Sequence, residues 1–213
     1  MGLVYNTSVV RDSLHRYMDV SNPKCYTSGN TFVRDLKTQN TWNIVNTNSD
    51  ISYNTDGYFE WAGVNPDYID IEDTGQMPLF SLSAWVYNVS GGDSRHSLLR
   101  NFWEIVGTSL QFWSYDFAND YWRATATGVV PYDTWTHICT TWDGSVIRHY
   151  INGELIWTDG STSSGTSENF YHIGGYSGRN FKGRLGVLMV HTKTLNADEI
   201  KQNFEAHRGR YGV

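Results

Sequence analysis

The chain has 213 residues, a formal net charge of −6 and no run of Lys or Arg, which argues against binding to nucleic acid phosphates. Charged residues make up only 18%, so long solvent-exposed helices are not expected. The 9 Trp, 14 Tyr and 9 Phe suit strands and the 20 Gly suit tight turns, which favours an all-β domain.

The amino-terminal residues carry no recognisable sorting signal. Residues 1–6 lack a basic stretch followed by an apolar one, and no apolar run in the chain reaches membrane-spanning length. We therefore expect no membrane insertion. Cys25 and Cys139 are too few for a disulfide framework and are expected to be free thiols. Residues 1–13 are interpreted as an N-terminal arm, and residues 14–213 as a single domain.

Strand signals dominate from residue 58 onwards. Between residues 80 and 87, Phe80 and every second residue after it are apolar, whereas Ser81, Ser83, Trp85 and Tyr87 fall on the other face. Alternation of this kind is typical of a strand with two different faces. The predicted strands cover residues 58–61, 68–71, 80–87, 109–115, 121–127, 135–142, 146–152, 154–157 and 183–191.

Three hairpins are indicated by their turns. Asp143-Gly144 and Asn152-Gly153 each join two β-rich runs, and glycine tolerates the positive φ that a tight turn needs. The polar residues 116–120 separate two aromatic runs and predict a third hairpin. Residues 160–167 are small and polar and are expected to form an exposed loop.

One helix is predicted near the carboxyl terminus. Asn196 can cap it and Glu199 follows three residues later, as in a capping box. Ile200 and Phe204 share a face at a spacing of four residues, and Gly209 is predicted to end the helix. The helix is expected to pack against a β-sandwich through this apolar face.

Three groups of segments, in this order along the chain, resemble the laminin-G-like branch of the concanavalin A-like superfamily. The resemblance implies a two-sheet antiparallel jelly-roll sandwich with one short C-terminal helix. The segments are FSLSAWV (80–86), then WTHICTTWDG (135–144) with YING (150–153), then IGGY (173–176), FKGRL (181–185) and LNADEI (195–200).

A narrower resemblance extends over almost the whole chain. The opening LHRYMDVSNPKCY (14–26) and the closing NFEAHRGRYGV (203–213) are similar to laminin-G-like structural proteins of tailed bacteriophages, especially marine and cyanobacterial ones. The resemblance implies a non-enzymatic virion protein, made in the host bacterial cytoplasm, with other capsid or tail proteins as partners. We expect a homo-oligomer on the capsid surface, since the chain has no heptads or repeats for a fibre shaft. The alternative is a carbohydrate-binding tail, fibre or adhesin module.

A glycoside hydrolase is the sharpest enzyme hypothesis for this fold, and the sequence argues against it. The run Tyr68-Ile69-Asp70-Ile71-Glu72 resembles the Glu-x-Asp-x-Glu strand of laminarinase-type β-glucanases, in which three carboxylates share one face. Tyr68 stands where the nucleophile belongs. We therefore predict that the protein is not an enzyme.

No metal and no cofactor are predicted. The seven histidines form no His-Glu-x-x-His motif, and His137 is interpreted as a core or inter-strand histidine. Asp116, Asn119 and Asp120 carry oxygen atoms that suit a hard cation, but a polar hairpin tip explains them equally well.

The remaining candidate site is aromatic and lies in the hairpin around residues 116–120. Trp113 and Tyr115 share one strand face, and Tyr121 and Arg123 share a face of the partner strand. Rings of this kind stack on sugars and Arg binds hydroxyl or carboxylate groups, so these four residues are the candidates for host-glycan binding. The alternative is that the rings fill the core.

Overall fold

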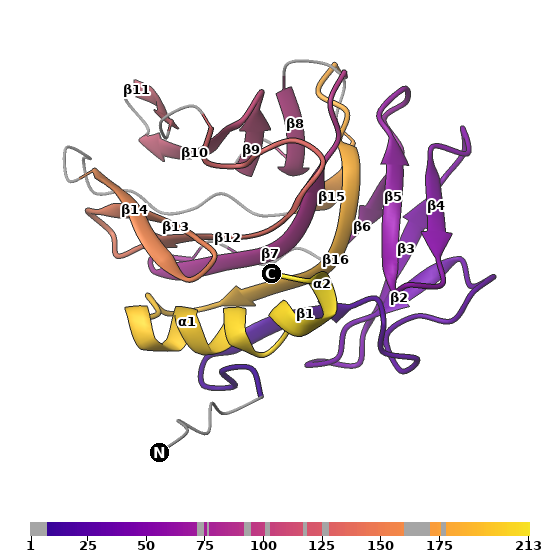
Figure 1. The fold of residues 1–213 in the computed structure, drawn as a ribbon, viewed down its shortest axis with the longest axis horizontal. Helices are drawn as coiled ribbons and strands as arrows, with labels where there is room; N and C mark the ends of the chain where they lie inside the picture. The colour runs from indigo at the N-terminus through magenta and orange to yellow at the C-terminus, as the bar shows by residue number, and fades with distance from the viewer. Residues whose placement is uncertain are drawn as a thin grey trace.

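The computed structural model describes residues 8–71, 75, 77–91, 95–100, 103–116, 119–124, 128–159, 171–175 and 178–213, with the backbone alone from residue 113 to 124. Two antiparallel sheets face one another, and two short helices near the carboxyl terminus lie against the outer face of one sheet (Figure 1). This arrangement confirms the predicted all-β, two-sheet jelly-roll class.

The first sheet has the order β14-β13-β12-β7-β16-β5-β4, and β1 also pairs with β16. The long strand β16 bonds to β7 along one side, and shares its other side between β5 and β1. The strands are β1 (Leu14–Asp19), β4 (Ile51–Asn54), β5 (Tyr58–Ala62), β7 (Phe80–Asn88), β12 (Trp135–Trp142), β13 (Ile147–Ile151), β14 (Glu154–Asp159) and β16 (Lys182–His191).

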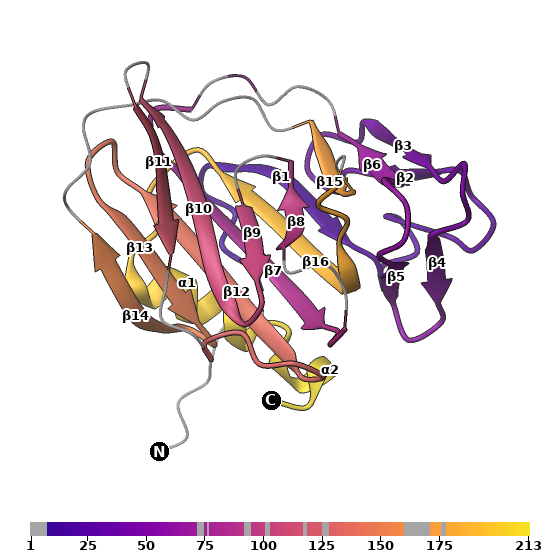
Figure 2. The ribbon, with the colours of Figure 1, turned by 90° about the horizontal axis from the view of Figure 1, so that it is seen from above.

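The second sheet has the order β11-β10-β9-β8-β15-β6-β3-β2, and Figure 2 shows it from above. Its strands from β8 to β11 lie over β7 and β12, while β2, β3 and β6 lie near β4 and β5 at the opposite end from β14. The strands are β2 (Phe32–Arg34), β3 (Thr41–Val45), β6 (Tyr68–Asp70), β8 (Arg95–Leu99), β9 (Trp103–Val106), β10 (Ser109–Asp116), β11 (Asn119–Ala124) and β15 (His172–Gly174).

The main core lies between the sheets and follows from strand alternation. Phe80 and the apolar residues at every second position after it in β7 are buried there, as the sequence predicted. One hydrogen bond crosses the core, because the Trp103 indole N–H of β9 donates to Thr140 Oγ of β12 at 2.8 Å. Burial of the indole nitrogen is thereby compensated. Cys25 and Cys139 are buried free thiols, as predicted.

The outer face of the first sheet is covered by α1 (Ala197–Glu205) and α2 (Arg208–Tyr211). Trp85 of β7 stacks on Phe204 with ring centroids 5.6 Å apart and on Tyr211 at 4.4 Å. The predicted capping box is present: the Glu199 N–H donates to Asn196 Oδ1, and the Asn196 N–H donates to the Glu199 carboxylate, each at 3.0 Å.

The helical region does not end at Gly209, as the sequence had indicated. The first helix ends at Glu205, and Gly209 lies inside the following turn of helix. The chain finally leaves the helical conformation at Gly212, whose φ of 71° is in the left-handed region that glycine favours. This extra turn carries Arg210 and Tyr211 to the sheet.

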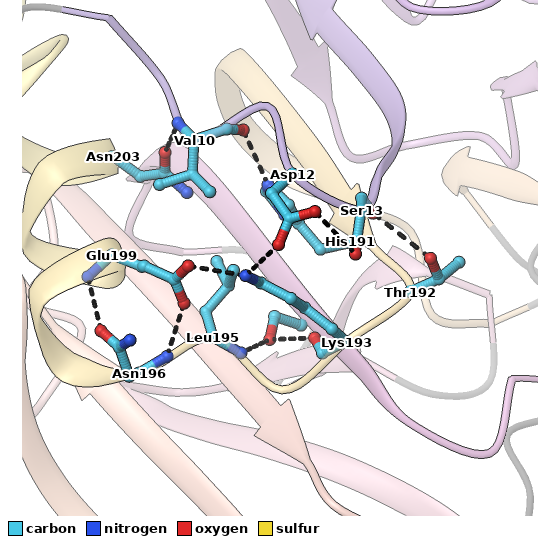
Figure 3. A network of polar contacts seen from close by, with 11 residues as sticks. Val10, Asp12, Ser13, His191, Thr192, Lys193, Leu195, Asn196, Glu199 and Asn203 are labelled. Atoms are coloured by element: carbon cyan, nitrogen blue, oxygen red, sulfur yellow. Dashed lines mark hydrogen bonds and ion pairs between the residues drawn. The ribbon is translucent and has the colours of Figure 1, made fainter.

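Residues 8–13, within the predicted arm, pack on the domain itself (Figure 3). The Val10 N–H donates to Asn203 Oδ1 of α1 at 2.8 Å, and Val10 is buried with Ile200. Lys193 binds both Asp12 and Glu199 at 2.6 Å, which ties this segment to the start of α1. The boundary at residue 13 stays a prediction.

Substitution of Phe204 by Ala should lower the free energy of unfolding by about 3–5 kcal/mol, because it leaves a cavity beside Trp85 and His137. Chemical denaturation monitored by circular dichroism measures this loss. Lys201→Ala, at a half-exposed position of the same helix, is the control and should change stability by less than about 0.5 kcal/mol. Equal stability of the two variants would show that the helix does not help hold the domain together.

The domain should lose stability as the pH falls from about 6.5 towards 3. Complete burial lowers the pKa of His137 and of His149 to about 3, so the unfolded chain takes up protons at a pH where the folded chain does not. Within that pH window, each of these two histidines can lower the free energy of unfolding by up to about 1.4 kcal/mol for each pH unit of acidification. Melting curves of the wild type and His137→Leu test this, since the variant should show a shallower decline. If the stability of both proteins declined equally steeply with falling pH, the lowered pKa of His137 would be contradicted.

Candidate functional site

Four half-buried side chains form a row across the outer face of the first sheet. Trp135 of β12 lies opposite Tyr87 of β7, Tyr87 lies opposite Arg184 of β16, and Arg184 lies opposite Glu60 of β5. Directly opposed residues of antiparallel strands project from the same face. The four residues, called here the aromatic–arginine row, therefore form one surface immediately beyond the end of α2.

Arg184 is held at the centre of this row. Its Nε donates to Glu60 Oε1 at 3.2 Å, and its guanidinium carbon lies 4.5 Å from the centre of the Tyr87 ring and 5.2 Å from that of Tyr58. Burial lowers the pKa of Arg184, but the bond to Glu60 outweighs it, so the pKa is raised overall. The guanidinium is thus charged and fixed between two rings, with N–H groups left to donate.

Trp135 is packed by three other aromatic rings. Its ring centre lies 5.5 Å from Tyr58 and 5.7 Å from Tyr87, both in edge-on geometry, and 4.5 Å from Tyr211. Tyr211 can approach the sheet because Gly186 stands below it, where an added Cβ would collide with the tyrosine hydroxyl. The supporting rings fix the Trp135 side chain while part of it stays accessible to solvent.

A second arginine reaches the same place from α2. Arg210 makes two hydrogen bonds to the buried Asp19 carboxylate, at 2.7 and 3.2 Å. Burial raises the pKa of Asp19, but the bonds and charge of Arg210 lower it by more, so the net shift is downward. The paired geometry fixes Arg210 and joins the carboxyl-terminal turn to β1.

These groups surround a hollow of about 380 Å³. Both arginines in its wall are paired with carboxylates, and Asp56 adds a further acidic side chain, so the wall has no excess of positive charge. It offers ring faces, guanidinium N–H donors and carboxylate acceptors within one small volume. The lining residues are Asp56, Tyr58, Trp135, Arg184, Arg210 and Tyr211.

The residues predicted as glycan ligands lie on neighbouring strands of the second sheet. In the backbone register, Trp113 lies opposite Trp122, and Arg123 lies opposite Phe112. The pair Trp113 and Tyr115 on β10 and the pair Tyr121 and Arg123 on β11 therefore occupy alternate positions along the two strands. No member of one pair lies directly opposite a member of the other. The side chains of Trp113, Tyr115, Tyr121 and Arg123 lie outside the described part of the structure. Their assignment stays a prediction.

The run considered for a glycosidase begins with a ring and not with a carboxylate. Tyr68 stacks on His172 of β15 with centroids 3.8 Å apart, and His172 Nε2 lies 3.7 Å from the exposed Asp70. The next acidic residues of this run, 72 and 73, lie outside the described residues. The described part of the run is therefore a stacked aromatic pair with one solvated carboxylate.

One buried carboxyl group could serve as a proton donor. Burial raises the pKa of Glu104 in β9 although Arg179 donates to it at 3.1 Å. The residues opposite Glu104 in the register are Ser97 and Gln111. Hydrolysis of a glycosidic bond needs a second carboxyl group facing the first, and neither of these neighbours supplies one.

Within the described ranges, no cluster of three His, Cys, Asp or Glu side chains is arranged to hold a metal ion. The hairpin residues Asp116, Asn119 and Asp120 are described as backbone only. In the same ranges, neither helix has the length and apolar character needed to cross a bilayer.

The fold and the outer-face row define a jelly-roll module that presents aromatic and paired polar side chains to solvent. The chain belongs to the concanavalin A-like lectin/glucanases superfamily, whose family model matches residues 63–201. This match confirms the wider resemblance seen in the sequence. Among curated proteins, none matches the chain in sequence.

Solved structures share the fold at low sequence identity. The receptor-binding domain of botulinum neurotoxin D superposes with a TM-score of 0.69 at 12% identity, over 92% of this chain and 53% of that one. Domain 4 of AbnA, an extracellular arabinanase from Geobacillus stearothermophilus in complex with arabinotriose, gives 0.62 at 17% identity, over 90% and 98%. A Trypanosoma rangeli sialidase gives 0.63 at 14% identity, over 92% and 33%.

The chain spans about half the length of the toxin chains that it matches, and one third of the sialidase. At identities of this size, the superpositions show a common fold alone. The arabinanase domain, in contrast, is matched over nearly its whole length.

Proposed function

We propose that the protein is a non-catalytic carbohydrate-binding module and that the aromatic–arginine row is its binding site. The observation that carries this proposal is the half-exposed Trp135 ring, fixed by three other rings beside two oriented guanidinium groups. The electron-rich face of an indole attracts the C–H groups on one face of a sugar ring. Guanidinium and carboxylate groups at its edge bind the hydroxyl groups.

The charge balance of the hollow favours a neutral sugar. Arg184 already bonds to Glu60 and Arg210 to Asp19, so an anionic ligand would compete with two existing ion pairs. A hydroxyl group can instead accept from either guanidinium, and it can donate to the half-exposed Glu60 carboxylate. Neither pair need break for a hydroxyl-rich ligand to bind.

The arabinanase domain supports the choice of a first probe. It was solved in complex with arabinotriose, a neutral oligosaccharide, and it has nearly the same extent as this chain. Binding is proposed to leave the sugar intact, because Glu60, the carboxylate of the row, lies opposite Arg184 and Ser52 and not opposite a second carboxyl group. Arabinotriose recovered unchanged after incubation with the protein would agree with this.

Arabinotriose should bind the wild type, and Trp135→Ala should weaken that binding at least tenfold, since the ring face is lost. Titration calorimetry measures both. Tyr171→Ala removes an exposed ring elsewhere and is the matched control, which should bind like the wild type. Arg184→Gln should also weaken binding without disturbing Trp135, and melting curves establish that each variant is folded.

The site assignment fails if Trp135→Ala and Tyr171→Ala bind arabinotriose equally well. The proposed function fails if neither arabinotriose nor a panel of neutral oligosaccharides binds to the folded wild type.

We also propose that the module is carried on a phage capsid surface as a homo-oligomer. Support comes from the resemblance at residues 14–26 and 203–213, and from the many weak contacts that a repeated surface module can add together. A tail, fibre or adhesin module is the alternative location. Either location suits a protein that binds host-surface glycans.

Removal of residues 2–7 tests the assembly role of the arm, because it leaves the contacts of Val9 and Val10 with the domain in place. We expect the truncated protein to keep its melting temperature but to lose self-association in sedimentation velocity, and to lose co-purification with particles. A full-length protein that is monomeric and never co-purifies with particles would contradict the proposal.

A further inference from the structure

Two adjoining hollows lie at the end of the sandwich formed by β2, β3 and β4, and the second reaches Phe59, the chain neighbour of Glu60 in the aromatic–arginine row. The first, of about 320 Å³, is lined by residues of the turn before β2 and of β2 itself. The second, of about 460 Å³, lies between β3 and the β4–β5 hairpin. Tyr26 and Asn30 line both hollows, so the two adjoin, and together they are called here the groove.

The first hollow contains two cations without a carboxylate partner. Lys24 and Arg34 both line it, and within the described part of the chain neither makes an ion pair. This is unexpected in a chain with 22 acidic and 16 basic residues, where other arginines such as Arg148 and Arg210 do have such partners. The lining of both hollows includes no Asp or Glu.

The backbone holds these two cations near one another. The Cys25 N–H donates to the Asn22 carbonyl at 2.8 Å, which closes the turn that carries Lys24. The Arg34 N–H then donates to the Cys25 carbonyl at 2.8 Å, so β2 is bonded directly to this turn. The fold therefore brings both residues to the lining of the same hollow, where an anion can interact with both positive charges.

The second hollow supplies aromatic and uncharged polar groups. Tyr26, Tyr53 and Phe59 pack together with centroids 4.7–6.0 Å apart, and the Tyr26 hydroxyl donates to the Asn30 carbonyl at 3.3 Å. Tyr53 is half-exposed in the wall. The lining also contains the aliphatic residues Ile44, Val45 and Ile51, and hydroxyl and amide side chains, namely Thr31, Asn46, Thr47 and Ser52. A ring face with hydroxyl and amide groups suits an uncharged sugar ring.

We propose that this groove is a second binding site, for an acidic oligosaccharide. The carboxylate or sulfate of one residue binds between Lys24 and Arg34, and the neighbouring sugar ring lies against Tyr53 in the second hollow. The site shares no lining residue with the hollow beside the aromatic–arginine row, where Arg184 and Arg210 are each paired with a carboxylate of the protein. The chain thus carries one surface for neutral glycans and another for acidic ones.

Titration calorimetry with trigalacturonate and with a sulfated galacto-oligosaccharide tests the proposal at low and at physiological salt. At least one of these probes should bind more weakly as salt rises, and the double substitution Lys24→Gln with Arg34→Gln should reduce its affinity at least tenfold. Lys201→Gln, which removes one positive charge from α1, is the control and should leave the affinity unchanged.

Tyr53→Ala separates a glycan site from a simple anion site. It should weaken binding of the acidic oligosaccharide and leave competition by free sulfate ion unchanged, because sulfate needs only the first hollow. Trp135→Ala should bind the acidic probe like the wild type, so loss of the neutral-sugar site does not affect this result. Melting curves establish that the variants fold.

Three results would overturn the proposal. The first is that neither acidic probe binds. The second is that a neutral galacto-oligosaccharide of the same length binds as tightly as the acidic probes. The third is that the double variant and Lys201→Gln bind the acidic probe equally well.

Discussion

The packing of the carboxyl-terminal helices on the first sheet determines which part of that sheet reaches solvent. Phe204 and Tyr211 stack on Trp85, and this contact covers the middle of the outer face. The part of the face that the helices cover ends at Tyr211, because Gly186 allows the Tyr211 ring to approach β16 closely there. Beyond this point Trp135, Tyr87 and the residues opposite them remain accessible. The candidate site is therefore a part of the outer face that the helices leave uncovered.

The two proposed surfaces differ in whether their cations are paired with carboxylates. At the row, the guanidinium groups of Arg184 and of the adjoining Arg210 are each fixed by a carboxylate, which orients their N–H groups and cancels their charge. In the groove beside β2, Lys24 and Arg34 are held close by backbone bonds and have no acidic residue in the surrounding wall. Each surface contains an arginine. Only Arg34, which has no carboxylate partner within the described residues, attracts an anion over a distance.

Structural features that depend on only a few neighbouring residues could be predicted from the sequence. The capping box at Asn196 and the Asp143-Gly144 turn are set by local hydrogen bonds and backbone angles, and the structure shows both. The strands β1 to β4, β8, β9 and β15 were not predicted, since each is short and mixes polar with apolar residues. The end of the helices was also misplaced, because the extra turn depends on the packing of Tyr211 against the sheet.

The row could not be predicted from local patterns. Its members come from β5, β7, β12 and β16, and only the registers between these strands bring them together. The sequence prediction instead chose Trp113 and Tyr121, which are close along the chain in one hairpin. The groove similarly joins a turn to a strand through the bond between Cys25 and Arg34. Both surfaces are products of tertiary pairing.

The central claim is that a neutral sugar binds on the outer face of the first sheet. The most direct measurement is a ¹⁵N–¹H spectrum of the tryptophan indole N–H signals during titration with arabinotriose, with assignments from single Trp→Phe variants. We predict that the Trp135 signal moves and saturates, while the signal of buried Trp85 does not. Saturable movement of the Trp113 signal with Trp135 unchanged would place the site in the hairpin of the second sheet and contradict the account.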